Sequence, residues 1–291
     1  MAARDTLQAL AFQRSSVADI SLLPSIPDQA IATYDPLEVL ASAQALLKSG
    51  SGLSEAERLN LHEQICIAAL DSGNLALAET HRDIIFRKFD PKTSIRAQKL
   101  SAYIYESTGN FEQALKTYEA ILEADETYVA AHKRIAALAK AQNQNQNAIK
   151  SLIQYLDTFS ADVEAWVELA ALYTVEGMFQ QAGFCYEELI VLRPDNIMFH
   201  LRYADVLYTL QRYDVSLKYY CAALELCRDT VRALYGIRLA SDQILASNKS
   251  PEPKIRALNQ LAKERLAALY QDRAKSTPKV VSVVKSWLAQ E

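Results

Sequence analysis

Residues 166–182, WVELAALYTVEGMFQQA, contain the pattern that decides the fold of this protein. Trp166, Leu169 and Tyr173 stand three and four positions apart, which places them on one face of a helix. Gly177 follows where a left-handed residue would end that helix, and a second helical pattern starts directly after it. The stretch therefore predicts a helical hairpin with its turn at Gly177.

The same hairpin recurs along the chain with a period close to 34 residues. The turn residue of the other units is Gly73, Gly109, Asn143 or Gln211. Two small residues keep the same spacing, one after each turn and one within each first helix. They are Ala78, Ala114, Ala148, Ala182 and Ser216 after the turns, and Cys66, Ala102, Ala136, Ala170 and Ala204 within the first helices. Small side chains at these positions indicate places where paired helices cross closely.

The period and the order of the large residues resemble the tetratricopeptide repeat, whose pattern is W-x-x-L-G-x-x-Y, then A-x-x-x-F, then P. Residues 163–196 match this pattern nearly throughout, with Ala170 in place of the consensus glycine. Ser101 and Arg82 depart from it, because they occupy positions that are apolar in other units. We therefore expect an all-α fold, a tetratricopeptide-repeat right-handed superhelical solenoid with N- and C-terminal capping helices.

The repeats divide the chain into four expected segments. Residues 1–34 have no clear period and form an irregular N-terminal segment. Residues 35–58 form an N-terminal capping helix and linker, and residues 59–228 form five tetratricopeptide-like repeats. Residues 229–291 form a degenerate repeat followed by C-terminal capping helices.

Local signals predict where the helices outside the repeats begin. Asp35-Pro36 can cap and start a helix, because proline is favoured in the first turn. Ser54 with Glu57 forms the capping-box pattern that opens the next helix. Near the C-terminus, Ser250-Pro251 predicts the start of a long helix to about residue 273, and Thr277-Pro278 predicts the start of a last one.

Composition excludes several classes of function. The chain of 291 residues has a net charge of −4 and a pI near 5.7, which argues against binding to nucleic-acid phosphates. No apolar run approaches the roughly 20 residues that span a bilayer, and the N-terminus is a poor signal peptide. We expect a cytosolic protein without a signal peptide or transmembrane segment, attached to membranes only indirectly.

Neither the cysteines nor the histidines form a recognisable chemical site. The four cysteines contain no C-x-x-C pair and none has a histidine at ligand spacing: Cys66, Cys185, Cys221 and Cys227. Three histidines fall at the repeat position of Trp166: His62, His132 and His200. Phosphate-loop, dinucleotide and nucleophile-elbow motifs do not occur. We therefore expect no catalytic residues, no cofactor and no metal.

The candidate site is instead a groove lined by the first helix of each repeat. Its outward-facing positions run from a basic stretch to an apolar, tyrosine-bearing stretch. The residues that we expect to bind a partner are Arg96, Lys99, Tyr103, Lys133, Arg134, Lys140, Val167, Leu201 and Tyr208. Such a surface suits a peptide or helix with acidic residues beside apolar anchors, and an ordinary solvated face is the alternative.

A longer segment resembles a narrower family. It reads EAWVELAALYTVEGMFQQAGFCYEELIVLRPDNIMFHLRYADVLYTLQRYDVSLKYYCAALEL and is followed by RALYGI. It is similar to subunit 2 of the endoplasmic reticulum membrane protein complex, a family with E-A-W-x-E-L-A, F-C-x-E-E-L, Y-A-x-V-x-Y-T and R-A-L-x-G runs in this order. AALDSGNLALAE at residues 68–79 is similar to the first unit of that family. The resemblance covers roughly residues 60–240.

The resemblance implies a non-catalytic scaffold on the cytosolic face of the endoplasmic reticulum membrane. The complex of this family inserts tail-anchored and multipass membrane proteins. Its subunit 2 binds cytosolic segments of membrane-embedded subunits, notably subunits 5 and 3, and subunit 8 or 9 is a further partner where it exists.

Two other classes of protein remain as alternatives. A chaperone adaptor would bind C-terminal carboxylates through lysines and asparagines, but Tyr103 and Ala137 stand where such a clamp favours asparagine. A prenyltransferase α-chain is also built from helical hairpins, but its N-Y-x-x-W type of motif is absent around Trp166.

Overall fold

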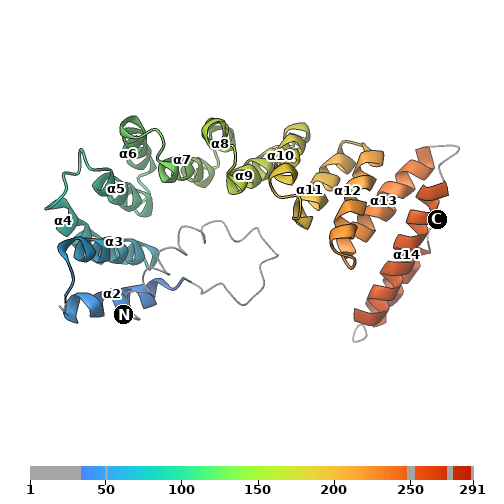
Figure 1. Ribbon diagram of the computed structural model, residues 1–291, viewed down its shortest axis with the longest axis horizontal. Coiled ribbons are helices and arrows are strands. Elements are labelled where there is room, and N and C mark those ends of the chain that lie inside the picture. Colours follow the sequence, from blue (N-terminus) through green and yellow to red (C-terminus); the bar gives the residue numbers. More distant parts are fainter. Residues whose placement is uncertain (1–33, 50–51, 248–252, 274–277, 290–291) are drawn as a thin grey trace. The chain divides into compact units, whose positions relative to one another are not determined.

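The structure is a computed structural model in which helices are joined by short turns (Figure 1). It describes residues 34–49, 52–247, 253–273 and 278–289. No strand occurs in these ranges, and the expected all-α fold is confirmed. The chain divides into two compact units, residues 1–152 and 153–291. The N-terminal segment up to residue 33 and the expected helix start at residues 250–252 lie outside the described residues.

The first unit contains two helices for each repeat, preceded by a capping helix. Its helices are α2 (Pro36–Ser49), α3 (Glu55–Asp71), α4 (Leu75–Phe86), α5 (Ile95–Ser107), α6 (Phe111–Ala124), α7 (Val129–Ala141) and the first half of α8 (Asn145–Thr158). From α2 to α7 each helix packs against the next, and α3 also packs against α5. The packing is therefore between neighbours, as in other repeat proteins.

The second unit continues the same order and ends in longer helices. Its helices after α8 are α9 (Val163–Val175), α10 (Phe179–Leu192), α11 (Ile197–Thr209), α12 (Tyr213–Leu226), α13 (Val231–Ser247), α14 (Pro253–Arg273) and α15 (Pro278–Leu288). From α9 to α15 each helix packs against the next, and α11 also packs against α13. Helices α14 and α15 lie where the sequence predicted two C-terminal helices, and the expected break between them, including Thr277, falls outside the described residues.

The predicted caps are formed by the side chains that the sequence indicated. The carboxylate of Asp35 accepts a hydrogen bond from the backbone N–H of Leu37 at 2.8 Å, at the start of α2. The hydroxyl of Ser54 accepts one from the N–H of Glu57 at 3.3 Å, and the Glu57 carboxylate accepts one from the Ser54 N–H at 2.8 Å. These bonds satisfy N–H groups that a helix start otherwise leaves without a partner.

The five turn residues predicted from the period share one backbone conformation. Gly73, Gly109, Asn143, Gly177 and Gln211 all have positive φ, between 57° and 75°. This left-handed region favours glycine, because a Cβ there approaches the following carbonyl oxygen. The helix boundaries and the turn conformation together confirm the register of the repeats.

Exchanging residues at two of these turns should change stability in opposite directions. We expect Gln211→Gly to raise the free energy of unfolding by up to about 1 kcal/mol, because it relieves the left-handed strain while making the unfolded chain more flexible. Gly177→Ala should lower it by about 1 kcal/mol. No atom of the described residues lies within 4 Å of an added Cβ at residue 177, so the backbone alone causes the loss. Urea denaturation measures both, and two changes of the same sign would contradict this account.

The small residues predicted at the helix crossings are all fully buried. Each has 0% of its surface exposed: Cys66, Ala78, Ala102, Ala114, Ala136, Ala148, Ala170, Ala182, Ala204 and Ser216. In one repeat the two crossing positions touch directly, because the Ser216 hydroxyl donates a hydrogen bond to the Ala204 carbonyl at 2.8 Å. The crossings therefore lie where the sequence placed them.

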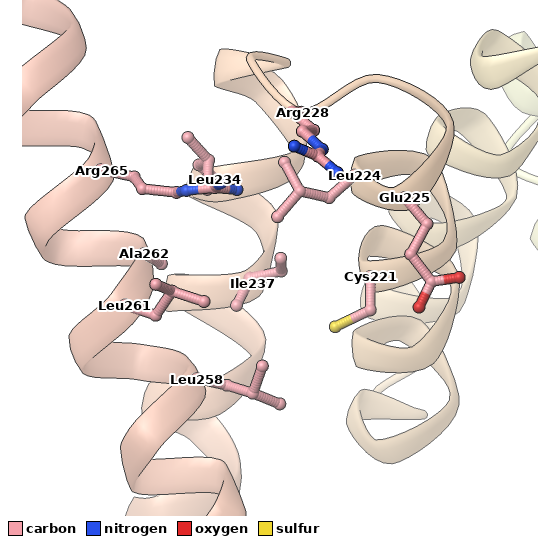
Figure 2. Close-up of a pocket in the computed structure, with 10 residues that line it drawn as sticks. All are labelled: Cys221, Leu224, Glu225, Arg228, Leu234, Ile237, Leu258, Leu261, Ala262 and Arg265. Atoms are coloured by element: carbon pink, nitrogen blue, oxygen red, sulfur yellow. The ribbon is translucent and has the colours of Figure 1, made fainter.

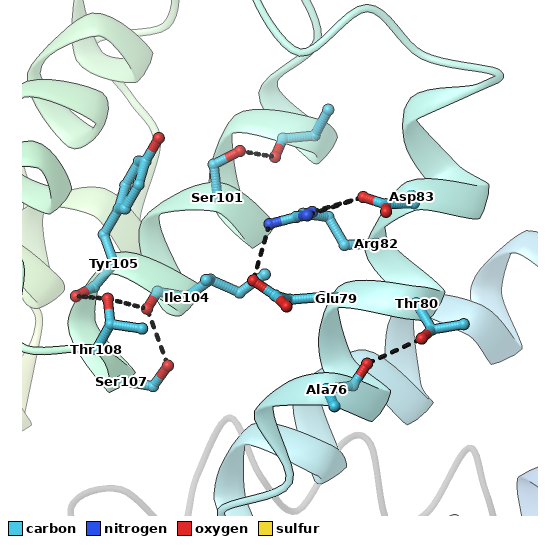
Figure 3. Close-up of polar contacts among 11 residues, drawn as sticks. Ala76, Glu79, Thr80, Arg82, Asp83, Ser101, Ile104, Tyr105, Ser107 and Thr108 are labelled. Atoms are coloured by element: carbon cyan, nitrogen blue, oxygen red, sulfur yellow. Dashed lines mark hydrogen bonds and ion pairs between the residues drawn. The ribbon is translucent and has the colours of Figure 1, made fainter.

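Two polar residues at otherwise apolar repeat positions have partners on their own helices (Figure 3). The Arg82 guanidinium on α4 lies 2.9 Å from the carboxylate of Asp83 and 3.9 Å from that of Glu79. The Ser101 hydroxyl on α5 donates a hydrogen bond to the carbonyl of Ala97, one turn earlier, at 3.1 Å. Since neither needs a partner on another helix, the hairpin is preserved.

Candidate partner-binding surface

In the first unit, one carboxylate binds two of the cations predicted to line the groove. Glu63 on α3 lies 2.7 Å from Arg96 Nε and 2.5 Å from Lys99 Nζ, both on α5. Burial alone would lower the pKa of the Lys99 ammonium, but the Glu63 carboxylate outweighs this and holds that pKa above its ordinary value. Lys99 therefore stays charged, and the Glu63 carboxylate offsets positive charge of both side chains within the protein.

A second carboxylate repeats this arrangement one helix pair further along. Both oxygens of Glu106 on α5 accept hydrogen bonds from the Arg134 guanidinium on α7, with Nε at 3.1 Å from Oε1. The Tyr118 hydroxyl donates a further hydrogen bond to Glu106 at 2.6 Å. The Arg134 guanidinium also lies over the Tyr103 ring, 5.4 Å from its centre. The predicted residues Tyr103 and Arg134 thus belong to one polar cluster.

These contacts form a charge ladder that joins the first helices α3, α5 and α7. Its members are Glu63, Arg96, Lys99, Glu106 and Arg134. The sequence indicated a basic stretch that lines the groove, and the structure adds that each of these three cations faces a carboxylate of a neighbouring helix. The ladder holds successive repeats together, and its carboxylates offset the positive charge that a partner would meet.

The other two predicted basic residues lie on α7. Lys133 is half-buried and Lys140 is exposed. Each also takes part in an interaction within the protein. Both lie on the same helix as Arg134.

In the second unit, Val167 belongs to an apolar stripe on α9. Val167, Ala171 and Val175 follow one another at intervals of four residues, which places them on one face of the helix. The first two are half-buried, and Val175 is 74% exposed. Tyr208 on α11 is half-buried, and its ring packs edge-on against that of Tyr213, with the ring centres 5.1 Å apart.

Leu201 is not a surface residue, and its assignment to the groove is wrong. It is 2% exposed and lies in a core cluster formed with residues of α12, α13 and α14. Its repeat position is shared by Lys99, Lys133 and Val167, which are all half-buried. This position lies at the contact between successive first helices, where a long cationic side chain can still reach water but a leucine is buried.

The residues at the repeat position of Trp166 have a structural role. In three repeats a ring nitrogen at this position donates a hydrogen bond to the backbone carbonyl six residues earlier. The pairs are Trp166 with Ser160 at 2.8 Å, His132 with Glu126 at 2.9 Å and His200 with Pro194 at 2.9 Å. These bonds tie each first helix to the turn before it, which explains why tryptophan and histidine exchange there.

His62, at the same position in the first repeat, bonds a second histidine instead. Its Nδ1 lies 2.7 Å from Nδ1 of His81 on α4, so one ring donates and the other accepts. Burial lowers the pKa of both imidazoles, and the charge of His62 lowers that of His81 further. The pair is therefore uncharged near neutral pH and links α3 to α4.

The described residues contain no group of three or more histidine, cysteine, aspartate or glutamate side chains that could hold a metal ion. All four cysteines are free thiols, and burial raises the pKa of Cys185 to about 12, which makes its thiol unreactive. None of the described helices combines the length and the apolar composition needed to cross a bilayer.

Comparison with known proteins reveals the family. The EMC2 TPR-like repeat domain matches residues 82–219. ER membrane protein complex subunit 2-A of Xenopus laevis is 39% identical over 202 residues, which cover 68% of this chain and 67% of the relative. The TPR repeat protein oca3 of Schizosaccharomyces pombe is 31% identical over 231 residues, covering 77% and 79% of the two chains. The chain belongs to the family of ER membrane protein complex subunit 2.

The fold of this subunit 2 family member also occurs in distant repeat proteins. The C-terminal part of a TPR repeat-containing protein from Cytophaga hutchinsonii aligns with a TM-score of 0.60 over 85% of this chain and 94% of that one. The two sequences are only 14% identical, so the likeness shows the tetratricopeptide-repeat fold alone. The subunit 2 family match, in contrast, covers α5, α7, α9 and α11, the helices that carry the predicted surface.

Proposed function

We propose that this protein is a non-catalytic scaffold subunit of the endoplasmic reticulum membrane protein complex, peripheral to the cytosolic face of the membrane. In that role it supports the insertion of tail-anchored and multipass membrane proteins. It does so by binding cytosolic segments of membrane-embedded subunits, notably subunits 3 and 5, with subunit 8 or 9 as a further partner where present. Membership of the subunit 2 family supports the assignment of this protein to the complex. Stacked hairpins support a binding function because they offer extended surfaces.

The apolar stripe of α9 is the observation that carries the binding role. Apolar residues at intervals of four suit a helix or extended segment that inserts its own apolar side chains. Val175 leaves three quarters of its surface in water, whereas a bound segment would cover it. We propose that Val167 and Tyr208 in the second unit, and Lys133 and Lys140 in the first, contact the same class of partner.

Val175→Glu should weaken assembly, because a buried charge without a partner would face the apolar side of the bound segment. We expect about tenfold less of the membrane-embedded subunits to co-purify from detergent-solubilised membranes, since 1.4 kcal/mol of lost binding is tenfold in affinity. Quantitative mass spectrometry of the co-purified chains measures the loss.

Val191→Glu is the matched control. Val191 is 76% exposed and lies, like Val175, in the last turn of its helix, but on the second helix α10. The Val191→Glu variant should assemble with the membrane-embedded subunits at the wild-type level. Normal assembly of Val175→Glu with loss of assembly in Val191→Glu would instead assign the partner to the second helices. Arg134→Glu is unsuitable here, because it would place a second carboxylate against Glu106 and destabilise the fold.

A further inference from the structure

The second unit contains a pocket that none of the predicted partner-binding residues lines. It has a volume of about 340 Å³ and lies between α12, α13 and α14 (Figure 2). Leu234, Ile237 and Ala262 are its buried apolar residues, and Leu224, Leu258 and Leu261 are its more exposed ones. Its volume is at the lower end of the range of ligand pockets. We call it the α12–α14 pocket.

Two arginines give this pocket an excess of positive charge. Arg228 extends from the turn between α12 and α13, and Arg265 extends from α14. Figure 2 shows both guanidinium groups toward the same end of the pocket, with Leu258 toward the other end. Among the described residues that line the pocket, Glu225 alone is acidic, and it is exposed. The lining therefore carries two positive charges and one negative charge.

These two arginines differ in their bonding from the arginines in the charge ladder. Within the described part of the chain, neither Arg228 nor Arg265 forms a hydrogen bond or an ion pair. Arg265 is nonetheless half-buried beside leucine side chains. A guanidinium presents a planar fork of donors that matches a carboxylate, so both arginines are available to bind one.

We propose that the α12–α14 pocket docks a short acidic–apolar segment of another protein. One leucine-sized side chain of this segment enters the apolar part of the pocket, and a carboxylate about one helical turn away binds Arg228 and Arg265. Apolar anchoring supplies affinity, and the charge pair fixes the orientation of the segment. The site is separate from the apolar stripe on α9, so the same chain can bind two segments.

The exposure of Leu261 favours a protein segment over a small molecule. This side chain is 44% exposed at the edge of the pocket. A segment lying across the pocket would cover it, whereas a ligand confined to the interior would leave it in water. A fatty acid has the same combination of carboxylate and apolar chain, so binding of oleate is measured alongside binding of a peptide.

Fluorescence anisotropy with the full chain tests the proposal. The probe is a fluorescein-labelled 12-residue helical peptide with two leucines four residues apart and two glutamates on the same face. A second peptide has lysines in place of the glutamates. We expect the acidic peptide to bind and the lysine peptide to bind at least about tenfold more weakly, because like charges then meet. Leu261→Ser should weaken binding of the acidic peptide as well.

Two double variants supply the matched comparison. The double variant Arg228→Glu with Arg265→Glu should bind the acidic peptide at least about tenfold more weakly than wild type does. The double variant Lys254→Glu with Arg256→Glu makes the same change of charge at exposed residues at the start of α14. Its affinity for the acidic peptide should stay within about twofold of the wild-type affinity. If circular dichroism shows that the first variant is unfolded, Arg228→Gln with Arg265→Gln replaces it, with the same expected direction.

Several outcomes would overturn the proposal. Absence of binding by the acidic peptide, equal binding of both peptides, or equal weakening in the two double variants would each contradict a specific acidic–apolar site. Binding of oleate that depends on Arg228 and Arg265, without binding of the peptide, would assign the pocket to an acyl ligand instead.

Discussion

Gly236→Ala should destabilise the second unit by about 1–3 kcal/mol, although the same exchange inside a helix usually stabilises by up to about 1 kcal/mol. An added Cβ at residue 236 on α13 would lie 2.4 Å from two ring atoms of Tyr220 on α12. The Tyr220 ring is 4% exposed, and its hydroxyl donates a hydrogen bond to Asp205 at 2.7 Å. Because Asp205 is also bound by Arg232, the ring cannot move aside without breaking a network between three helices.

Gly183→Ala is the control for this prediction. Gly183 is also buried within a helix, but its added Cβ would lie 3.6 Å from Val206 and 3.7 Å from Tyr203, which are ordinary contacts. We expect this variant to be unchanged or more stable by up to about 1 kcal/mol. Thermal and urea denaturation should therefore show a lower free energy of unfolding for Gly236→Ala and no decrease for Gly183→Ala. A stabilised Gly236→Ala protein would mean that α12 and α13 pack less closely than described.

Glu63→Ala should lower the free energy of unfolding by about 2 kcal/mol. The change leaves Arg96 and Lys99 without their carboxylate, and their side chains are only 26% and 20% exposed. Removing one partner of a fully buried pair costs about 3–5 kcal/mol, and an exposed pair contributes about 0–1 kcal/mol. The partial exposure of this cluster places the expected loss between the two.

Glu55→Ala is the matched control on the same helix. Glu55 is 68% exposed, and its carboxylate lies 2.7 Å from the ammonium of Lys88 in the turn after α4, so the two variants each lose one carboxylate of α3. Because water screens this exposed pair, the unfolding midpoint should stay close to wild type. An equal loss of stability in both variants would contradict the role assigned to the charge ladder.

Removal of Glu63 should also change how the stability of the protein depends on pH. The pKa of Lys99 is raised in the folded protein, so its pairing contributes full stability below the ordinary lysine value of 10.5. This contribution is lost as the pH rises through the higher folded-state pKa. The Glu63→Ala variant should lack that part of the alkaline loss, which denaturation at several pH values would measure.

The sequence by itself determined the repeats, because their rules are local. The steps between Gly109, Asn143, Gly177 and Gln211 located the left-handed turns, since sterics of a single residue decide which positions adopt positive φ. The same period located the crossing positions, where even the one polar member, Ser216, is fully buried. Helix starts at Pro36 and Glu55 were likewise predicted from side chains within three residues of them.

Part of the candidate surface could also have been read from the period. Glu63 and Lys99 are 36 residues apart, the same step that separates Gly73 from Gly109. They therefore occupy one position in successive repeats, and their opposite charges indicated a pair. Arg134 and Glu106 are 28 residues apart, which matches no repeat step, so this pair could not be found in that way.

Only the tertiary structure decided which surfaces remain open. Leu201 shares its repeat position with half-buried Val167, yet it is buried in a core cluster that includes residues of α12 and α13, the later helices that pack against α11. Arg228 and Arg265 line the same pocket, Arg228 from the turn after α12 and Arg265 from α14. Because α14 lies outside the repeats, no period relates the two residues. Backbone conformation depends on neighbours in the chain, whereas burial and charge pairing depend on which distant helices meet. That physical difference separates what the sequence determined from what the packing of the helices decided.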